Sequence, residues 1–162
     1  MVVLTGAAQA ALVSLGDGTV RDTNTNQIWL QDWDVNGGKT WATQKNWAEN
    51  LSFAGSNEWR LPEIGEYAKL FEDYLDLTQV AEFENVQPAF YWSGTEFTSG
   101  TSAWVFFPVD GFLTNGDFQA NQFFAVAVRP GDVAASVPEP QTLALALLAL
   151  GATVVARRRR TA

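Results

Sequence analysis

Seven tryptophans and the absence of both cysteine and histidine set the main constraint on this chain of 162 residues. Without cysteine, neither a disulfide nor a thiolate zinc site can hold the fold together. Stability must come from apolar burial, for which tryptophan supplies a large surface and an N–H that needs a partner. The same absences exclude cysteine nucleophiles, Ser-His-Asp triads and acid–base catalysis by histidine.

The basic residues are concentrated at the end of the chain, whereas the acidic residues are spread along it. Four of the ten Lys and Arg residues form the run 157–160, which leaves six basic against 18 acidic side chains elsewhere. A net charge near −12 for that remainder repels phosphate backbones, so we expect no nucleic acid partner. The charge is compatible with cation binding.

The C-terminus combines three features in a fixed order, and the first is Pro138, Glu139 and Pro140. An apolar helix is predicted over 142–156, shorter than the roughly 20 residues of a full membrane span. The arginines Arg157, Arg158, Arg159 and Arg160 follow it and are expected to remain cytoplasmic as a membrane stop, so the preceding domain faces outward. The alternative is a core helix with a solvated basic tail.

This ordered set resembles the PEP-CTERM sorting signal of Gram-negative bacteria, over residues 138–160. The resemblance implies a partner, the membrane protease-transpeptidase exosortase, and cleavage near Pro138, Glu139 and Pro140. It also implies export across the inner membrane, with a membrane-anchored precursor and a mature form at the cell surface or outside the cell.

The N-terminal residues 1–10 end in Ala8-Gln9-Ala10, a small-x-small pattern typical of signal-peptidase sites. We interpret them as the remnant of a signal peptide, with a frayed N-terminal strand as the alternative. One globular domain is then expected over 11–132, joined to the sorting signal by a linker over 133–137.

Two helices and several strands are predicted within 11–132. One helix is expected over 41–54, with Thr40 as N-cap and with Trp47, Ala48, Leu51 and Ala54 on its apolar face. The other is expected over 62–77, opened by Pro62 and apolar at Ile64, Tyr67, Ala68, Phe71, Tyr74 and Leu75. Strands are predicted over 19–22, 27–30, 90–95, 103–109, 112–117 and 122–129, which together indicate an α+β domain.

Several motifs in this domain occur in the order typical of one family. They are the segments 16–23, 28–30, 59–62 (Trp-Arg-Leu-Pro), 91–96, 103–106 and 128–132. The set resembles the family named after the C-terminal domain of the Legionella collagen-like adhesin (Lcl), which is related to C-type-lectin-like and formylglycine-generating-enzyme folds. The resemblance implies a C-type-lectin-like domain with two helices and a twisted antiparallel sheet. The thiol chemistry of cysteine-containing relatives does not carry over.

A calcium site is the first candidate for chemistry in this domain. Asp32, Asp34 and Asn36 alternate ahead of two glycines, and such oxygen ligands wrap around calcium. Thr43 stands where an EF-hand would need its bidentate Glu, so the alternative is a solvated acidic turn.

Aromatic and arginine residues are the other candidates. Trp33, Phe112 and Phe118 are predicted to be exposed and to stack on sugar rings. Trp29, Trp59, Trp92 and Trp104 are interpreted as core, with Pro62 as a structural residue. Arg60 and Arg129 are interpreted as half-buried structural residues that pair with carboxylates or carbonyls; gripping an acidic sugar is the alternative.

These observations favour a non-enzymatic surface module that binds a glycan, such as exopolysaccharide, or another matrix component, with calcium as an optional cofactor. A ligand-free envelope scaffold is the alternative. A carboxylate-based hydrolase is a third hypothesis, because glycosidases need only two carboxylates that face each other.

Overall fold

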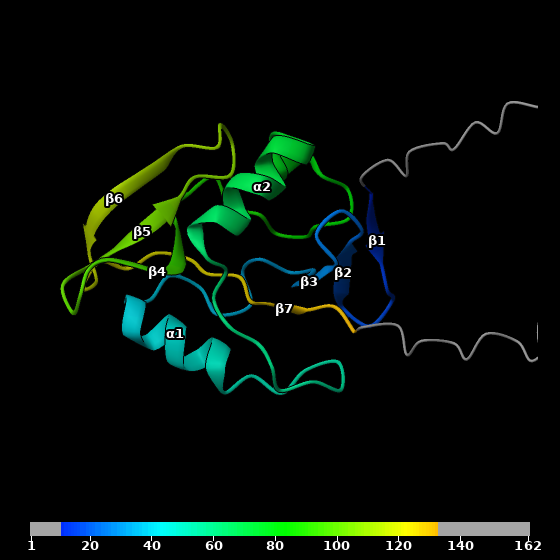
Figure 1. The fold of residues 1–162 in the computed structure, drawn as a ribbon, viewed down its shortest axis with the longest axis horizontal. Helices are drawn as coiled ribbons and strands as arrows, with labels where there is room; N and C mark the ends of the chain where they lie inside the picture. The colour runs from blue at the N-terminus through cyan, green and yellow to red at the C-terminus, as the bar shows by residue number, and fades with distance from the viewer. Residues whose placement is uncertain (1–10, 133–162) are drawn as a thin grey trace, which may run out of the picture. The chain divides into compact units, whose positions relative to one another are not determined.

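The computed structural model describes residues 11–132, which form an α+β domain with two helices and two antiparallel sheets (Figure 1). The predicted α+β class is therefore confirmed. Within these described residues, no helix is both long and apolar enough to cross a membrane. The apolar helix predicted over 142–156 lies outside them, as do the signal-peptide remnant and the linker.

The first sheet has the strand order β1-β2-β3-β7, with every neighbouring pair antiparallel. Its strands are β1 (Leu12–Ser14), β2 (Thr19–Asp22), β3 (Gln27–Leu30) and β7 (Val128–Pro130). The bounds of β2 and β3 are those predicted from the sequence. The turn between them is fixed by the Asp22 carboxylate, which accepts hydrogen bonds from the Asn24 amide and the Thr25 hydroxyl.

The second sheet is a meander of β4 (Tyr91–Thr98), β5 (Ser102–Phe106) and β6 (Leu113–Phe118). Bulges interrupt the register between β4 and β5 and again between β5 and β6, which increases the local twist. One face of this sheet packs on α2 (Ile64–Tyr74), whose Tyr67 ring stacks on Phe106 of β5 with ring centroids 4.6 Å apart.

The first helix, α1 (Trp41–Glu49), begins after Thr40 as predicted but ends five residues before the predicted end at 54. Residues 53–56 form a tight turn instead, in which Ala54 and Gly55 have φ angles of 48° and 73°. The buried face is also different from the prediction, because Trp41, Gln44 and Ala48 point to the core while Trp47 is only half-buried. The error arose because buried Gln44 was not counted as part of the apolar face.

Helix α2 begins at Ile64 rather than at Pro62, because Glu63 and Glu66 form a capping box that defines its N-terminus. It ends before Leu75, whose φ of 57° breaks the helix and leaves the side chain 64% exposed. The prediction that Leu75 belongs to the apolar face was therefore wrong. The short 3₁₀ helix η1 (Leu77–Gln79) follows and buries Leu77 instead.

The segment 122–129 was predicted as one strand, but only its end joins a ladder, as β7. Residues 125–128 are buried, whereas Phe123 and Phe124 are half-buried. Their neighbours differ along the segment: Phe123 pairs with Lys39, Phe124 with Tyr91 and Val128 with Arg60. The segment therefore changes partners too often to form a regular strand.

Gly131 follows β7 at a close approach between two backbone segments. Its amide donates to the Asn26 carbonyl at 2.7 Å, and an added Cβ would lie 2.4 Å from that same oxygen. We predict that Gly131→Ala lowers the free energy of unfolding by about 1–3 kcal/mol, because one of the two segments must move. Urea unfolding followed by tryptophan fluorescence measures this change.

Gly65 in α2 provides the matched control, since an added Cβ there meets nothing within 4 Å. Gly65→Ala is expected to raise the free energy of unfolding by about 0.5 kcal/mol, because alanine restricts the unfolded chain and favours helix. Equal effects of the two substitutions would contradict the steric argument for Gly131.

Candidate functional site

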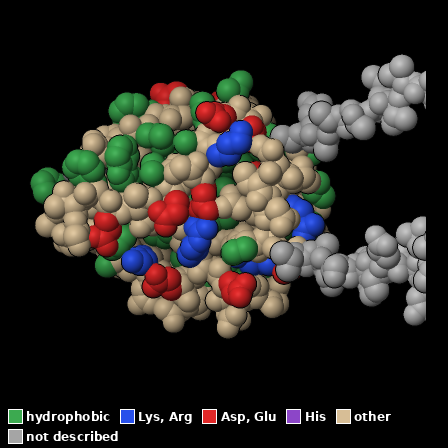
Figure 2. All heavy atoms as spheres, viewed as in Figure 1, with side chains coloured by type: hydrophobic (Ala, Val, Ile, Leu, Met, Phe, Trp, Pro, Cys, Tyr) green, Lys and Arg blue, Asp and Glu red, His purple; other side chains and the backbone are tan. Residues whose placement is uncertain are grey.

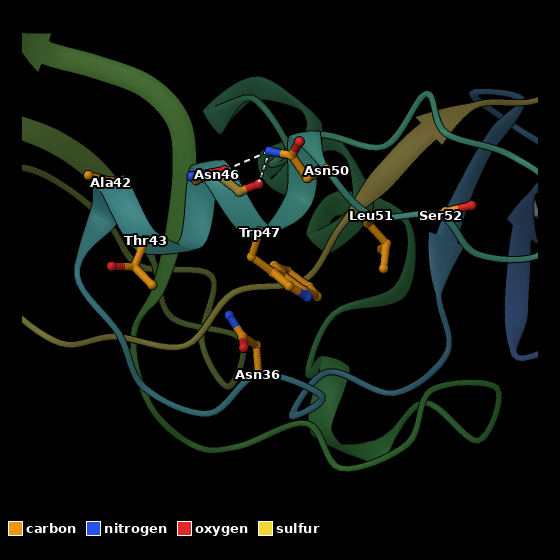
Figure 3. A pocket seen from close by; sticks show the side chains of 8 residues that line it. All are labelled: Asn36, Ala42, Thr43, Asn46, Trp47, Asn50, Leu51 and Ser52. Atoms are coloured by element: carbon orange, nitrogen blue, oxygen red, sulfur yellow. Dashed lines mark hydrogen bonds between the residues drawn. The ribbon is translucent and has the colours of Figure 1, made fainter.

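A shallow surface hollow of about 680 Å³ runs along one side of α1 (Figure 3). We call it the α1 hollow. Its lining is aromatic, hydroxyl and amide in character and includes no charged side chain; the residues are Asn36, Ala42, Thr43, Asn46, Trp47, Asn50, Leu51 and Ser52.

The α1 hollow has a fixed shape because a fully buried glutamine joins its two walls. Gln44 Nε2 donates to the carbonyls of Gly37 and Phe123, at 2.7 and 3.0 Å. Gln44 Oε1 accepts from Asn36 Nδ2 at 2.7 Å. The loop that contains Asn36 is thereby held opposite the helix, and Trp47 projects from α1 toward it (Figure 3).

The helical wall of the hollow presents two amides one turn apart. Asn50 Nδ2 donates to the backbone carbonyl of Asn46 at 2.9 Å and to its side-chain oxygen at 2.6 Å (Figure 3). Each amide has two donors and an acceptor with two lone pairs, so these contacts leave capacity for a ligand. An aromatic surface beside uncharged donors and acceptors suits a polyhydroxylated ligand.

A second, narrower cavity of about 280 Å³ adjoins the α1 hollow and shares Leu51 with it. We call it the acidic cavity, because two carboxylates lie among apolar walls. The lining residues are Gly18, Leu30, Gln31, Asp32, Val35, Leu51, Phe53 and Glu84.

The three predicted calcium ligands do not line a common cavity. Asp32 lines the acidic cavity, and its Oδ1 accepts a hydrogen bond from the Asp34 amide at 2.9 Å. Asn36 lines the α1 hollow and Asp34 lines neither. Among the residues that the structure describes, no three acidic side chains gather as a metal site would require. The calcium site stays a prediction.

Of the three aromatics predicted to stack on sugars, Trp33 was misplaced. Its side chain is 0% exposed, with Trp29 stacked on it at 6.0 Å and Phe83 and Tyr91 against its other sides. The acidic neighbours in sequence suggested a surface loop, but the indole turns inward. Phe112 and Phe118 are 54% and 69% exposed and lie at or just before β6, away from the lining of both cavities.

Sequence reasoning did not identify Trp47, Asn46, Asn50 or Glu84 as site residues. Trp47 was placed on the apolar face of the predicted helix because it lies four residues before Leu51. The useful signal was the pair Asn46 and Asn50, which lie four residues apart and so share a solvent face with Trp47 near it. Glu84 had no local signal, because its partner segment is some fifty residues away in sequence.

Comparison with known families identifies the domain and the tail. The family model of the Lcl C-terminal domain matches residues 18–129, more than half of the chain. This chain belongs to the Lcl C-terminal domain family. A second family model, that of the PEP-CTERM protein-sorting motif, matches residues 136–160. No curated protein matches the chain.

The sorting motif establishes how the Lcl domain is delivered. The protein is exported as a membrane-anchored precursor, processed by exosortase and displayed on the cell surface. The motif residues Pro138, Glu139 and Pro140 and the run 157–160 lie outside the described residues.

The tryptophans and arginines of the Lcl motifs are buried or half-buried. Trp59 and Trp92 are buried, and Trp92 Nε1 donates to the Lys39 carbonyl at 3.0 Å. Trp104 is half-buried and makes an edge contact with Phe97. Arg129 is buried with its guanidinium 5.6 Å from the Trp59 ring centroid, and Nη1 donates to the Pro130 carbonyl.

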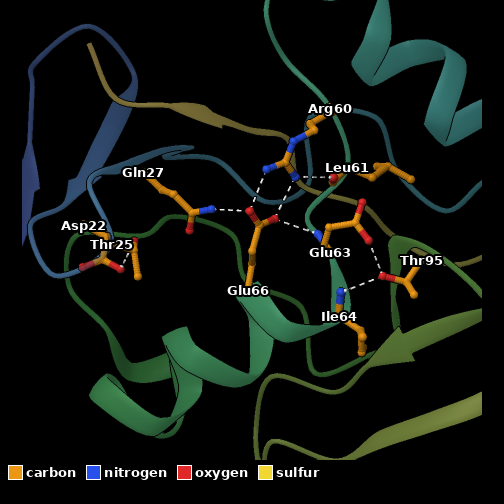
Figure 4. A network of polar contacts seen from close by, with 9 residues as sticks. All are labelled: Asp22, Thr25, Gln27, Arg60, Leu61, Glu63, Ile64, Glu66 and Thr95. Carbon is orange, nitrogen blue, oxygen red and sulfur yellow. Dashed lines mark hydrogen bonds and ion pairs between the residues drawn. The ribbon is translucent and has the colours of Figure 1, made fainter. Parts of the chain in front are cut away.

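The Trp-Arg-Leu-Pro motif of the Lcl domain leads into a half-buried polar network (Figure 4). Arg60 donates to both oxygens of Glu66, at 2.6 and 2.7 Å, and Gln27 donates to the same carboxylate. Pro62 is buried, and its carbonyl accepts from the Gly94 amide. The network therefore ties β3, the 59–62 segment and α2 together.

The ionisation of Glu66 is coupled to this network. Burial raises the pKa of the Glu66 carboxyl, but hydrogen bonds from Arg60 and from the Glu63 backbone lower it more, so the net pKa lies below its ordinary 4.5. The hydrogen bond to Glu66 raises the pKa of Arg60 in turn. Stabilisation by Glu66 is thus complete above its unfolded-state pKa and is lost as pH falls through the lower folded-state value.

We predict that Glu66→Gln lowers the free energy of unfolding at neutral pH by about 1–2 kcal/mol, since the charge-assisted bonds to Arg60 are lost from a partly exposed site. Below about pH 4.5 the stability of the wild type should decrease more steeply than that of the variant. Urea midpoints across the acid range measure both slopes. If the stabilities of the wild type and the variant decreased in parallel as the pH fell, Glu66 would not be the carboxyl whose ionisation is coupled to folding.

Proposed function

We propose that the Lcl domain is a non-enzymatic, C-type-lectin-like module that binds a glycan of the cell surface or the exopolysaccharide matrix. The observation that carries the proposal is the α1 hollow, in which Trp47 lies beside the amides of Asn36, Asn46 and Asn50. Export and display at the cell surface place the domain where such glycans occur.

The chemistry of the α1 hollow supports a sugar better than other ligands. One face of a pyranose ring is mainly C–H and packs on an indole, while the hydroxyls around its rim exchange hydrogen bonds with amides. A mainly apolar ligand would leave the Asn side chains without partners, which is costly in a water-excluded contact. The shallow shape suits an extended polymer rather than an enclosed small molecule.

The alternative is an envelope scaffold that acts through protein contacts. Figure 2 shows hydrophobic side chains gathered over the sheet of β4, β5 and β6. Exposed large apolar residues of that part of the chain are Phe97, Phe112 and Phe118. Such a patch is typical of interaction surfaces, so it competes directly with the α1 hollow as the functional face.

A hydrolase is the third candidate, because Asp32 and Glu84 both line the acidic cavity. A glycosidase needs one carboxyl that burial keeps protonated as the general acid. Glu84 is exposed and Asp32 is only half-buried, and both therefore lack that environment. We infer binding without cleavage. An unchanged chain length of the glycan after prolonged incubation with the protein is the expected result.

We predict that Trp47→Ala weakens binding to the host exopolysaccharide about tenfold, because the stacking surface is lost. Phe118→Ala is the matched control: it removes an exposed aromatic outside the hollow and should leave binding unchanged. Co-sedimentation of the full chain, held in a neutral non-glycosidic detergent, measures both affinities. Circular dichroism verifies that each variant is folded.

The reverse result would move the functional face to β6. Loss of binding with Phe118→Ala, and retention with Trp47→Ala, would assign the glycan contact to the exposed phenylalanines. Absence of binding by the wild type would favour the scaffold. Repeating the assay with a calcium chelator tests the predicted role of Asp32, Asp34 and Asn36, which requires that chelation abolish binding.

A further inference from the structure

The α1 hollow and the acidic cavity are neighbours on either side of a shared residue, and we call the two together the track. Leu51 lines both, and the consecutive residues Val35 and Asn36 line the acidic cavity and the hollow respectively. A polymer that lies over Trp47 and extends across Leu51 reaches the cavity that holds the two carboxylates. The chemistry of the track changes along this path from uncharged and amide-rich to apolar with negative charge.

The two carboxylates of the acidic cavity are held by paired backbone. Asp32 and Glu84 are partners in a parallel bridge, in which the Glu84 amide donates to Gln31 at 2.7 Å and the Trp33 amide donates to Glu84 at 3.0 Å. Directly paired residues project to the same side of the ladder. The Asp34 amide also orients the Asp32 carboxylate. Asp32 and Glu84 are therefore held on one side of this bridge, where both line the acidic cavity.

No lysine or arginine is among the residues that line either cavity of the described domain. Residues 11–132 contain 17 acidic and six basic side chains, a net charge of −11. The surrounding field therefore attracts cations and repels sulfated or carboxylated sugars. Leu30, Val35 and Phe53 supply apolar walls beside the two carboxylates, against which the carbon skeleton of a ligand can pack.

We propose that the track selects a glycan with free amino groups, a polymer that contains protonated amino sugars. This inference rests on the proposed function and names its ligand class. An uncharged part of the sugar ring packs on Trp47, the amides bind its hydroxyls, and an ammonium group of a neighbouring sugar lies between Asp32 and Glu84. Acidic glycans are excluded by charge, and neutral glycans occupy the α1 hollow alone.

The test compares two oligosaccharides that differ only in their nitrogen substituent: oligomeric glucosamine, with its amines protonated, and its fully N-acetylated counterpart. Calorimetric titration of the full chain in the same detergent should give an affinity about tenfold higher for the ammonium form, from two partly exposed ion pairs. The preference should decrease with added salt.

The double variant Asp32→Asn with Glu84→Gln should abolish this preference and retain binding of the N-acetylated oligomer. The asparagine side chain introduced by the first substitution still offers an oxygen to the Asp34 amide. The matched control, Asp110→Asn with Glu58→Gln, removes two exposed carboxylates outside both cavities and should keep the preference.

Three results would overturn the inference: equal affinity for the two oligomers, equal loss in the control variant, or binding of neither oligomer. The first two leave the proposed glycan function intact if Trp47→Ala still weakens binding of the N-acetylated form. If the protein binds neither oligomer but still binds the host exopolysaccharide, only the inference about amino sugars is rejected. If the wild type binds neither oligomer nor the host exopolysaccharide, the proposed function itself is rejected.

Discussion

The fold depends on the backbone of residues 123–130, which pairs with segments from both sheets. Phe123 exchanges hydrogen bonds with Lys39, Phe124 with the start of β4, Ala127 with β3 and Val128 with Arg60. A buried backbone must satisfy its N–H and C=O groups, and these four residues find their partners in four different parts of the chain. This buried segment consequently fixes the positions of β3, β4, α1 and the 59–62 motif relative to one another.

The α1 hollow is a consequence of that segment. The Phe123 carbonyl accepts from both Lys39 and Gln44, so the same buried segment also fixes the N-terminal end of α1. Gln44 then fixes the position of Asn36 relative to the helix, because its Oε1 accepts a hydrogen bond from Asn36 Nδ2. Because no disulfide is available, this rigidity comes from buried hydrogen bonds and from the aromatic cluster of Trp29, Trp33 and Tyr67.

Sequence patterns predicted the elements whose determinants are local. The β2–β3 hairpin was predicted to the residue because two short β-forming segments flank the turn residues 24–26, which Asp22 closes as an Asx turn. Features set by distant contacts were missed: the inward turn of Trp33 and the pairing of Asp32 with Glu84. In each case a partner far away in sequence decides the outcome. The α1 hollow was missed for a local reason. An apolar residue at helical spacing, such as Trp47, usually belongs to the core.

The charge distribution along the chain links its sorting to its proposed ligand. The arginine run 157–160 belongs to the tail, whereas residues 11–132 carry a net charge of −11. Cleavage near Pro138, which the sorting motif implies, separates the two and leaves an acidic domain outside the cell. Densely displayed copies of such a domain repel one another. A cationic polymer offsets that repulsion while it occupies the acidic cavities, whereas direct contacts between copies would have to overcome it.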